Sequence, residues 1–173
     1  MTALNRERIE KLLLALDESL ARRGVSADVY LVGGAAMALA FDITRATRDL
    51  DGVFRPASEV RMAADEVAEQ QGLAEGWLND AVKAFVPPGY DEGQQVVFES
   101  PNLRVCVASA EHMLAMKVAA ARVEQDRNDL LLLINALGIT SVSEALEVTR
   151  KCLGPSYPIP QRAEYLLQEI LET

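Results

Sequence analysis

Two short motifs contain candidate residues for binding phosphate and a metal ion. Gly33 and Gly34 follow the β-branched and aromatic run 29–32, and Asp49 and Asp51 stand two positions apart in the next apolar segment. Glycines at a strand end let the backbone approach a ligand closely, and a helix that starts there presents free N–H groups to a phosphate. Residues two apart in a strand point to the same face. The pattern therefore predicts a phosphate-binding turn beside two carboxylates that project together.

Two neighbouring carboxylates repel each other unless a cation lies between them. Mg²⁺ is commonly held by one or two carboxylates together with phosphate oxygens. Asp49 and Asp51 are therefore the expected metal ligands, and Mg²⁺ is the expected cofactor. Either motif alone also occurs as a tight turn or as a solvated surface pair, so the prediction depends on their combination.

Cationic side chains could complete such a site. Arg45 and Arg48 flank the aspartates, and guanidinium groups match phosphate oxygens, although surface salt bridges explain them equally well. Lys117 lies in an expected helix whose apolar face would let its ammonium group emerge beside the core, with a solvated lysine as the alternative. Asp126 and Asp129 are one helical turn apart and could face the same site. Asp126 could instead cap the start of its helix.

The remaining candidates have a stronger structural explanation. His112 has no cysteine or second histidine at ligand spacing, and Cys106 and Cys152 are too few for a disulfide framework, so reduced structural thiols are expected. Trp77 and Asn79 could line a base pocket, although a lone tryptophan more often belongs to the core.

Hydrophobic periodicity and turn residues predict an α+β chain. Strands mixed with helices over residues 1–108 favour a mixed-sheet core with flanking helices, and residues 109–173 are helical, the two together forming a single compact domain. The expected strands are 29–32, about 50–54, 95–98 and 103–107, with Asp49 and Asp51 both on the second and the last two joined as a hairpin. The expected helices are 4–23, 35–41, 58–71 capped by Ser58, 110–123, 126–137, 143–151 and 160–172.

Composition excludes several classes of protein. The 173 residues include 17 basic and 26 acidic ones, which gives a net charge of −9, and half of the residues are apolar. This balance favours a soluble globular chain and disfavours one that coats nucleic acid, although a local basic patch remains compatible with it. No stretch approaches the ~20 apolar residues of a membrane helix, and charges interrupt the N-terminal leucines, so a cytoplasmic protein without a signal peptide is expected.

The motifs resemble those of polymerase-β-type nucleotidyltransferases. The glycine pair, the following helix and Arg-x-Thr-x-Asp-x-Asp over 45–51 are similar to the small bacterial branch that includes AbiEii-like and MenT-like toxins. The segments 77–80, 117–120 and 126–129 also look like later motifs of that branch. The resemblance covers most of residues 28–138.

The resemblance implies a function and roles for individual residues. It implies transfer of a nucleoside monophosphate from a nucleoside triphosphate to tRNA or to a protein, and a toxin paired with a cognate antitoxin. Gly33, Gly34 and Lys117 would contact phosphates, Asp49 and Asp51 would bind metal, and Asp129 would orient the lysine or accept a proton. A nucleotide-binding or partner-binding module without turnover, protein AMPylation on the antitoxin side, and transfer to a small molecule are the alternatives.

One departure concerns a third carboxylate. Many enzymes of this superfamily carry one on a later strand, but the run 103–107 contains none. Either helices supply this charge or only one metal binds firmly, and Glu99, on the preceding strand, is a further candidate for the third carboxylate.

Overall fold

The structure is a computed structural model that describes residues 3–172, and it divides into two compact units. The first unit comprises Met1–Ala84 and Gln94–Ala108, and the second comprises Phe85–Gly93 and Ser109–Thr173. The division after residue 108 coincides with the one drawn from the sequence. The segment Phe85–Gly93, which precedes the hairpin, also belongs to the second unit, and this was not predicted. Packing of the two parts into a single compact domain stays a prediction.

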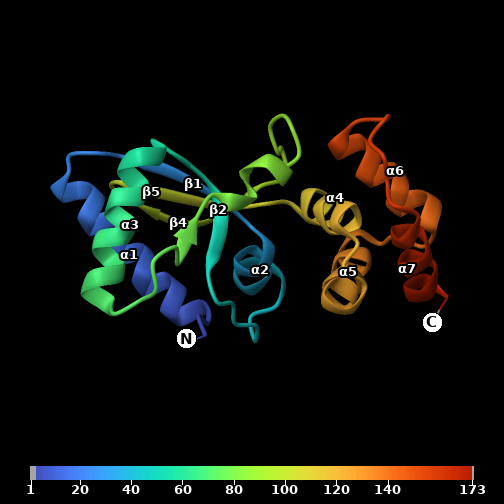
Figure 1. Ribbon diagram of the computed structural model, residues 1–173, viewed down its shortest axis with the longest axis horizontal. Coiled ribbons are helices and arrows are strands. Elements are labelled where there is room, and N and C mark those ends of the chain that lie inside the picture. Colours follow the sequence, from blue (N-terminus) through green and yellow to red (C-terminus); the bar gives the residue numbers. More distant parts are fainter. Residues whose placement is uncertain (1–2, 173) are drawn as a thin grey trace. The chain divides into compact units, whose positions relative to one another are not determined.

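The first unit is built on a five-stranded mixed sheet (Figure 1). Its strands lie in the order β3-β2-β1-β5-β4. Strand β1 pairs antiparallel with β2 and parallel with β5, β2 pairs parallel with β3, and β4 pairs antiparallel with β5. The strands are β1 (Ala27–Val32), β2 (Leu50–Arg55), β3 (Leu78–Asn79), β4 (Gln95–Ser100) and β5 (Leu103–Val107). The α+β class and the hairpin are thereby confirmed.

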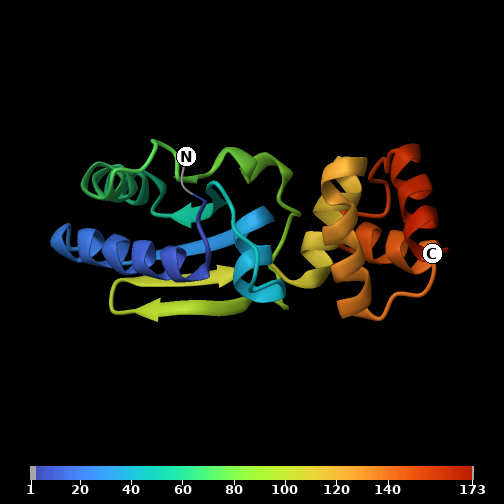
Figure 2. The ribbon, with the colours of Figure 1, turned by 90° about the horizontal axis from the view of Figure 1, so that it is seen from below.

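Two helices cover one face of this sheet (Figure 2). Helices α1 (Arg6–Arg22) and α3 (Ala57–Gln71) pack against each other, with α1 on β4 and β5 and α3 on β2 and β3. The leucines that recur along α1 at helical spacing are fully buried, as their periodicity predicts. The buried residues of β1 include Val29 and Leu31, whereas Tyr30 between them is only half-buried. Alternate strand residues therefore face the helices, and the intervening ones face the other way.

The segment after β1 differs from its prediction. A single helix over 35–41 was expected, but a four-residue turn of α-helix, α2 (Gly33–Ala36), continues into a π-helix, η1 (Met37–Phe41). The N–H of Asp42 bonds the carbonyl of Met37, five residues earlier, which produces the wider coil. The glycines thus begin the helical segment instead of preceding it.

Helix α3 starts one residue earlier than expected. Pro56 is its N-cap residue and no side chain caps it, so the prediction that Ser58 caps this helix is wrong. Gly72 ends the helix in the left-handed conformation, with φ of 64°, which its missing side chain permits. A short 3₁₀ turn, η2 (Ala81–Phe85), follows β3.

The second unit is helical. Its helices are α4 (Ala110–Ala120), α5 (Val123–Leu137), α6 (Val142–Leu153) and α7 (Gln161–Leu171). Helix α4 stops earlier than predicted because Ala121 adopts a left-handed conformation, with φ of 46°. Helix α5 starts at Val123, three residues earlier than predicted, with Arg122 as its N-cap residue. This tight corner brings the end of α4 close to the beginning of α5.

Two further expectations concern membranes and thiols. Over residues 3–172, no single helix has the length and apolar character to cross a bilayer; α5 and α6, bent by 91°, satisfy that criterion only as a pair.

Cys106 is buried, Cys152 is half-buried, and both are free thiols, as expected. Burial raises the pKa of each thiol, so neither has the thiolate character of a reactive cysteine.

Candidate functional site

The pairing of β1 with β2 brings the glycine turn to one of the two aspartates. Val32, the last residue of β1, lies opposite Asp51, so Gly33 begins its turn beside that carboxylate. Gly33 has φ of 62°, which a glycine adopts without strain, and a Cβ at this position would lie 3.8 Å from Asp51 Oδ2. The turn and the carboxylate, 18 residues apart in sequence, therefore share one end of the sheet.

Asp49 lies directly before β2, not on it. The strand begins at Leu50, which corrects the expectation that both aspartates belong to it. Burial raises the pKa of the Asp49 carboxyl, the negative charge of Asp51 raises it further, and the charge of Arg48 partly opposes both. After burial, the charge of Asp51 is therefore the largest influence on the Asp49 carboxyl.

Thr47 connects the parts of this end of the sheet, and the sequence-based reasoning gave it no role. Its hydroxyl donates a hydrogen bond of 3.0 Å to the carbonyl of Asp49, and its backbone forms an isolated β-bridge with Leu4. A Cβ on Gly34 would lie 2.7 Å from Thr47 Oγ1, so any larger residue at that position must displace the threonine. The Thr-x-Asp spacing was the available signal, because threonine hydroxyls commonly bond backbone groups two residues away.

The two arginines of the motif lie in different surroundings. Arg48 is exposed, and its charge acts on Asp49. Arg45 is half-buried, and its charge lowers the pKa of the Asp42 carboxyl after the larger effects of two hydrogen bonds from Thr44. The structure therefore associates Arg48, more directly than Arg45, with the carboxylate pair.

The titration of Asp49 gives a first testable prediction. We expect its carboxyl to titrate above its ordinary value of 3.8 in the wild type and lower in Asp51→Asn, which removes one of the two causes. Because the folded-state pKa is the higher one, stability falls as pH rises from the unfolded to the folded pKa, and Asp51→Asn should flatten that fall. Carboxyl ¹³C chemical shifts measured against pH test this expectation, and an unchanged Asp49 titration in the variant would contradict it.

Asn79 lies beside Asp51 on the next strand. The two residues are register partners in the parallel pair of β2 and β3, and both are half-buried. Asn79 donates a hydrogen bond from Nδ2 to the carbonyl of Gly76, and its Oδ1 accepts one from the N–H of Ala81. The strand next to the aspartates therefore contributes a neutral amide where a third carboxylate could stand.

Glu99, one candidate for the third carboxylate, is far from this end of the sheet. It pairs with Arg104, which pairs with Asp28 near the start of β1, whereas Asp51 pairs with Val32 at the end of that strand. Strands β5 and β1 also separate β4 from β2. The prediction for Glu99 is therefore wrong, because the sheet order places its strand at the opposite edge.

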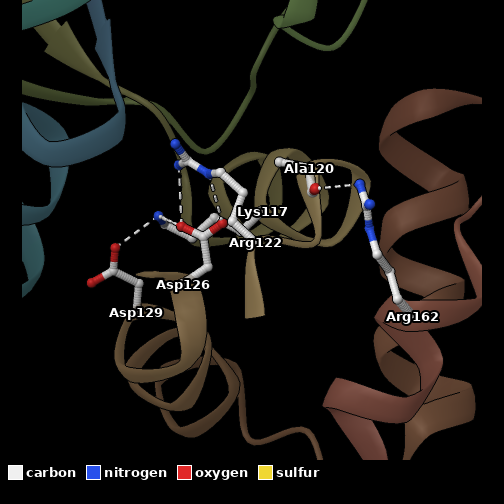
Figure 3. A network of polar contacts seen from close by, with 6 residues as sticks. All are labelled: Lys117, Ala120, Arg122, Asp126, Asp129 and Arg162. Carbon is white, nitrogen blue, oxygen red and sulfur yellow. Dashed lines mark hydrogen bonds and ion pairs between the residues drawn. The ribbon is translucent and has the colours of Figure 1, made fainter. Parts of the chain in front are cut away.

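A second charged cluster lies within the helical unit (Figure 3). Lys117 Nζ lies 2.8 Å from Asp126 Oδ1 and 2.7 Å from Asp129 Oδ2. Lys117 is only 7% exposed, and both aspartates are also buried. The expected association of Lys117 with Asp129 is thus present, and the alternative of a solvated lysine is wrong.

Asp126 takes part in the same cluster and does not cap its helix. It lies in the first turn of α5, where Arg122 forms hydrogen bonds of 3.1 and 3.2 Å to its two carboxylate oxygens. Burial alone would raise the pKa of the Asp126 carboxyl, but the hydrogen bonds and charges of Lys117 and Arg122 outweigh it and hold the pKa below its ordinary value. Asp126 is therefore a buried carboxylate shared by two cations.

The model of a family described as a nucleotidyltransferase of unknown function, DUF6036, matches residues 10–153. The chain belongs to this nucleotidyltransferase family. The match spans most of both units, from within α1 to the end of α6. Searches of curated proteins and of solved structures found no match.

The side chains beside the glycine turn can be compared with the ligands that Mg²⁺ prefers. Over residues 3–172, no group of three or more histidine, cysteine, aspartate or glutamate side chains could hold a metal ion, so the donor set tested against Mg²⁺ is the predicted pair of carboxylates. Two carboxylates suffice for Mg²⁺ when phosphate oxygens and water complete its coordination. The mutual repulsion that raises the pKa of Asp49 is relieved by a cation, so this nucleotidyltransferase has donors that fit the metal.

The single histidine has structural contacts. His112 Nδ1 lies 3.3 Å from Asp91 Oδ1 and 3.2 Å from Ser109 Oγ, at the first turn of α4. Asp91 also accepts hydrogen bonds from the backbone N–H groups of Gly93 and Ser109. These contacts attach the loop before the hairpin to the start of α4, within the second unit.

Proposed function

We propose that the protein is a Mg²⁺-dependent nucleotidyltransferase that moves a nucleoside monophosphate from a nucleoside triphosphate to a macromolecular acceptor. The observation that carries the proposal is the pairing of Val32 with Asp51, which brings the glycine turn and the two carboxylates to one end of the sheet. Family membership supports nucleotidyl transfer in general. The acceptor, the metal and the roles of individual residues are the proposal.

The reaction requires a hydroxyl oxygen to attack the α-phosphorus while pyrophosphate leaves. A bond forms from that oxygen to phosphorus, the bond from phosphorus to the bridging oxygen breaks, and the hydroxyl proton passes to a base. Gly33 and Gly34 would hold the leaving phosphates, because their missing side chains leave the backbone accessible. Asp49 and Asp51 would hold Mg²⁺, which when bound offsets charge on the phosphate and lowers the pKa of the acceptor.

Two residues of the helical unit retain the roles that the resemblance implies. Lys117 would contact nucleotide phosphates, and Asp129 would orient Lys117 or accept a proton. The 2.7 Å contact between them supports an orienting role for Asp129. Asp126, at 2.8 Å from the same ammonium group, would share that role.

The acceptor distinguishes the biological roles. Transfer to the 3′ end of tRNA would fit a toxin paired with an antitoxin, whereas transfer to a hydroxyl side chain of a partner protein would fit protein AMPylation on the antitoxin side. Incubating the protein with each α-labelled triphosphate, Mg²⁺, total tRNA and cell protein tests the proposal. We expect label in one of the two fractions, and label in neither, with no pyrophosphate released, would exclude transfer to a macromolecule.

A nucleotide-binding module without turnover is the second candidate. The amide of Asn79 beside Asp51 favours it, because a neutral group contributes less to cation binding than a carboxylate. Nucleotide binding in calorimetry, without release of pyrophosphate over hours, would select this candidate. Pyrophosphate release would select the enzyme.

Asn79→Asp is expected to strengthen metal binding by about tenfold or more, because one favourable charge contact worth about 1.4 kcal/mol gives that factor. The change is nearly isosteric: Oδ1 can still accept the hydrogen bond from Ala81, whereas the hydrogen bond from Nδ2 to the carbonyl of Gly76 is lost. Calorimetry or Mn²⁺ paramagnetic resonance on the full chain measures it. Asp80→Asn, which changes the next residue along the chain and its ion pair with Arg61, is the control and should leave metal affinity unchanged. Equal affinities for wild type and Asn79→Asp would show that Asn79 lies outside the metal site.

A further inference from the structure

A cavity of about 300 Å³ lies against Asp49 in the first unit. One wall consists of Arg48 and Asp49, and the other is the loop 72–77, which connects α3 to β3. Leu4 also lines it. Neither the family description nor the proposed roles of the carboxylates and glycines account for this cavity.

The cavity and the glycine turn lie on opposite sides of Asp49 along the sheet edge. Gly33 follows β1, Asp49 precedes β2 and Trp77 precedes β3, and these strands are adjacent in the order β1, β2, β3. The N–H of Leu50 bonds the carbonyl of Trp77 at 2.6 Å, which fixes the loop beside the start of β2. The carboxylate pair therefore stands between the turn and the cavity.

This order matches the order of groups in a nucleoside triphosphate. Neighbouring strands lie about 4.8 Å apart, so the turn and the loop are separated by about 10 Å, with the carboxylates between them. With the terminal phosphates at the glycine turn and the α-phosphate at the carboxylates, the nucleoside would extend towards the loop 72–77.

The walls of the cavity suit a base and a ribose. Trp77 is buried and its indole Nε1 donates to the carbonyl of Ala64, so the ring is held rigidly. Leu73 adds apolar surface, whereas the exposed Glu75 and Arg48 offer polar groups at the opening. Small-molecule sites of about this volume typically combine apolar walls with a few polar groups.

We propose that this cavity binds the nucleoside of the donor triphosphate, an inference that rests on the proposed function. The loop 72–77 would then determine which base is accepted, because its backbone and Glu75 are the groups that a base edge would meet. Binding of the acceptor there is the competing outcome.

The test uses a variant whose side chain fills the cavity, and it compares the binding of two kinds of probe to the full chain. Ala74 is exposed and lines the cavity, so Ala74→Trp should occupy it without disturbing the core. The probes are tripolyphosphate, which has no nucleoside, and each of the four nucleoside triphosphates, all with Mg²⁺ and measured by calorimetry. Ala21→Trp, the same change on the exposed surface of α1, is the control.

The expected result is a selective loss. Wild type and Ala21→Trp should bind at least one nucleoside triphosphate about tenfold or more tightly than tripolyphosphate, and Ala74→Trp should lose that difference while keeping its affinity for tripolyphosphate. Unchanged nucleotide binding by Ala74→Trp, an equal loss for both probes, or no preference for nucleotide in the wild type would overturn the inference. A wild type that binds neither probe would instead refute the proposed function.

Discussion

Asp51→Asn is expected to reduce nucleotidyl transfer by about a thousandfold or more while leaving the protein folded. Metal coordination at the reacting phosphate supplies several kcal/mol of transition-state stabilisation, and about 1.4 kcal/mol corresponds to each tenfold change in rate. Asp49→Asn should have a similar effect on the rate. The loss would be measured as transfer of label from α-labelled triphosphate to the acceptor fraction.

The stability of these variants separates a catalytic role from a structural one. Burial and then repulsion by Asp51 raise the pKa of Asp49, so removing either charge relieves an unfavourable interaction, and the melting temperature should stay the same or rise. Asp28→Asn, which changes an exposed aspartate near the other end of β1, is the control and should keep full activity. Transfer at the wild-type rate in both Asp49→Asn and Asp51→Asn would exclude the proposed site.

Lys117→Met is expected to destabilise the protein by about 3–5 kcal/mol, because removing the cation of a buried ion pair leaves the carboxylates of Asp126 and Asp129 with less compensating charge. Lys117 is held between Asp126 and Asp129, and Arg122 contacts only Asp126 in the hydrogen bonds described above. Urea unfolding of the full chain would measure the change. Lys151→Met, the same substitution at an exposed position of α6, should change stability little.

The dependence of stability on pH provides a second test of the ion pairs between Lys117 and the two aspartates. Because the folded-state pKa of Asp126 lies below its ordinary value, its contribution to stability is present above that value and is lost as pH falls through the folded-state pKa. Wild type should therefore lose stability below about pH 4, and Lys117→Met should lose less over that range. Equal stability of Lys117→Met and wild type at neutral pH would mean that the buried ammonium group is not needed to compensate the aspartates.

Much of the local structure could be predicted from residue patterns. The leucine spacing of the first helix, the hairpin before residue 108 and the glycine at the end of α3 all act through neighbours in sequence, and the structure contains each of them. Helix starts were less predictable. Ser58 does not cap α3 and Asp126 does not cap α5, because in each case the helix begins earlier, and Asp126 bonds Lys117 and Arg122 instead.

The two motifs of the candidate site could be recognised in the sequence alone. They are a glycine pair after a strand and two aspartates, two positions apart, at the next strand. The residues next to these motifs depend on how the strands and helices pack. Sheet order placed Asn79 next to Asp51 and left Glu99 on a distant strand, and the left-handed turn at Ala121 folded α5 back so that Lys117 meets two aspartates. Periodicity records which face of an element is buried, whereas the choice of neighbouring strand or helix depends on contacts between residues far apart in sequence.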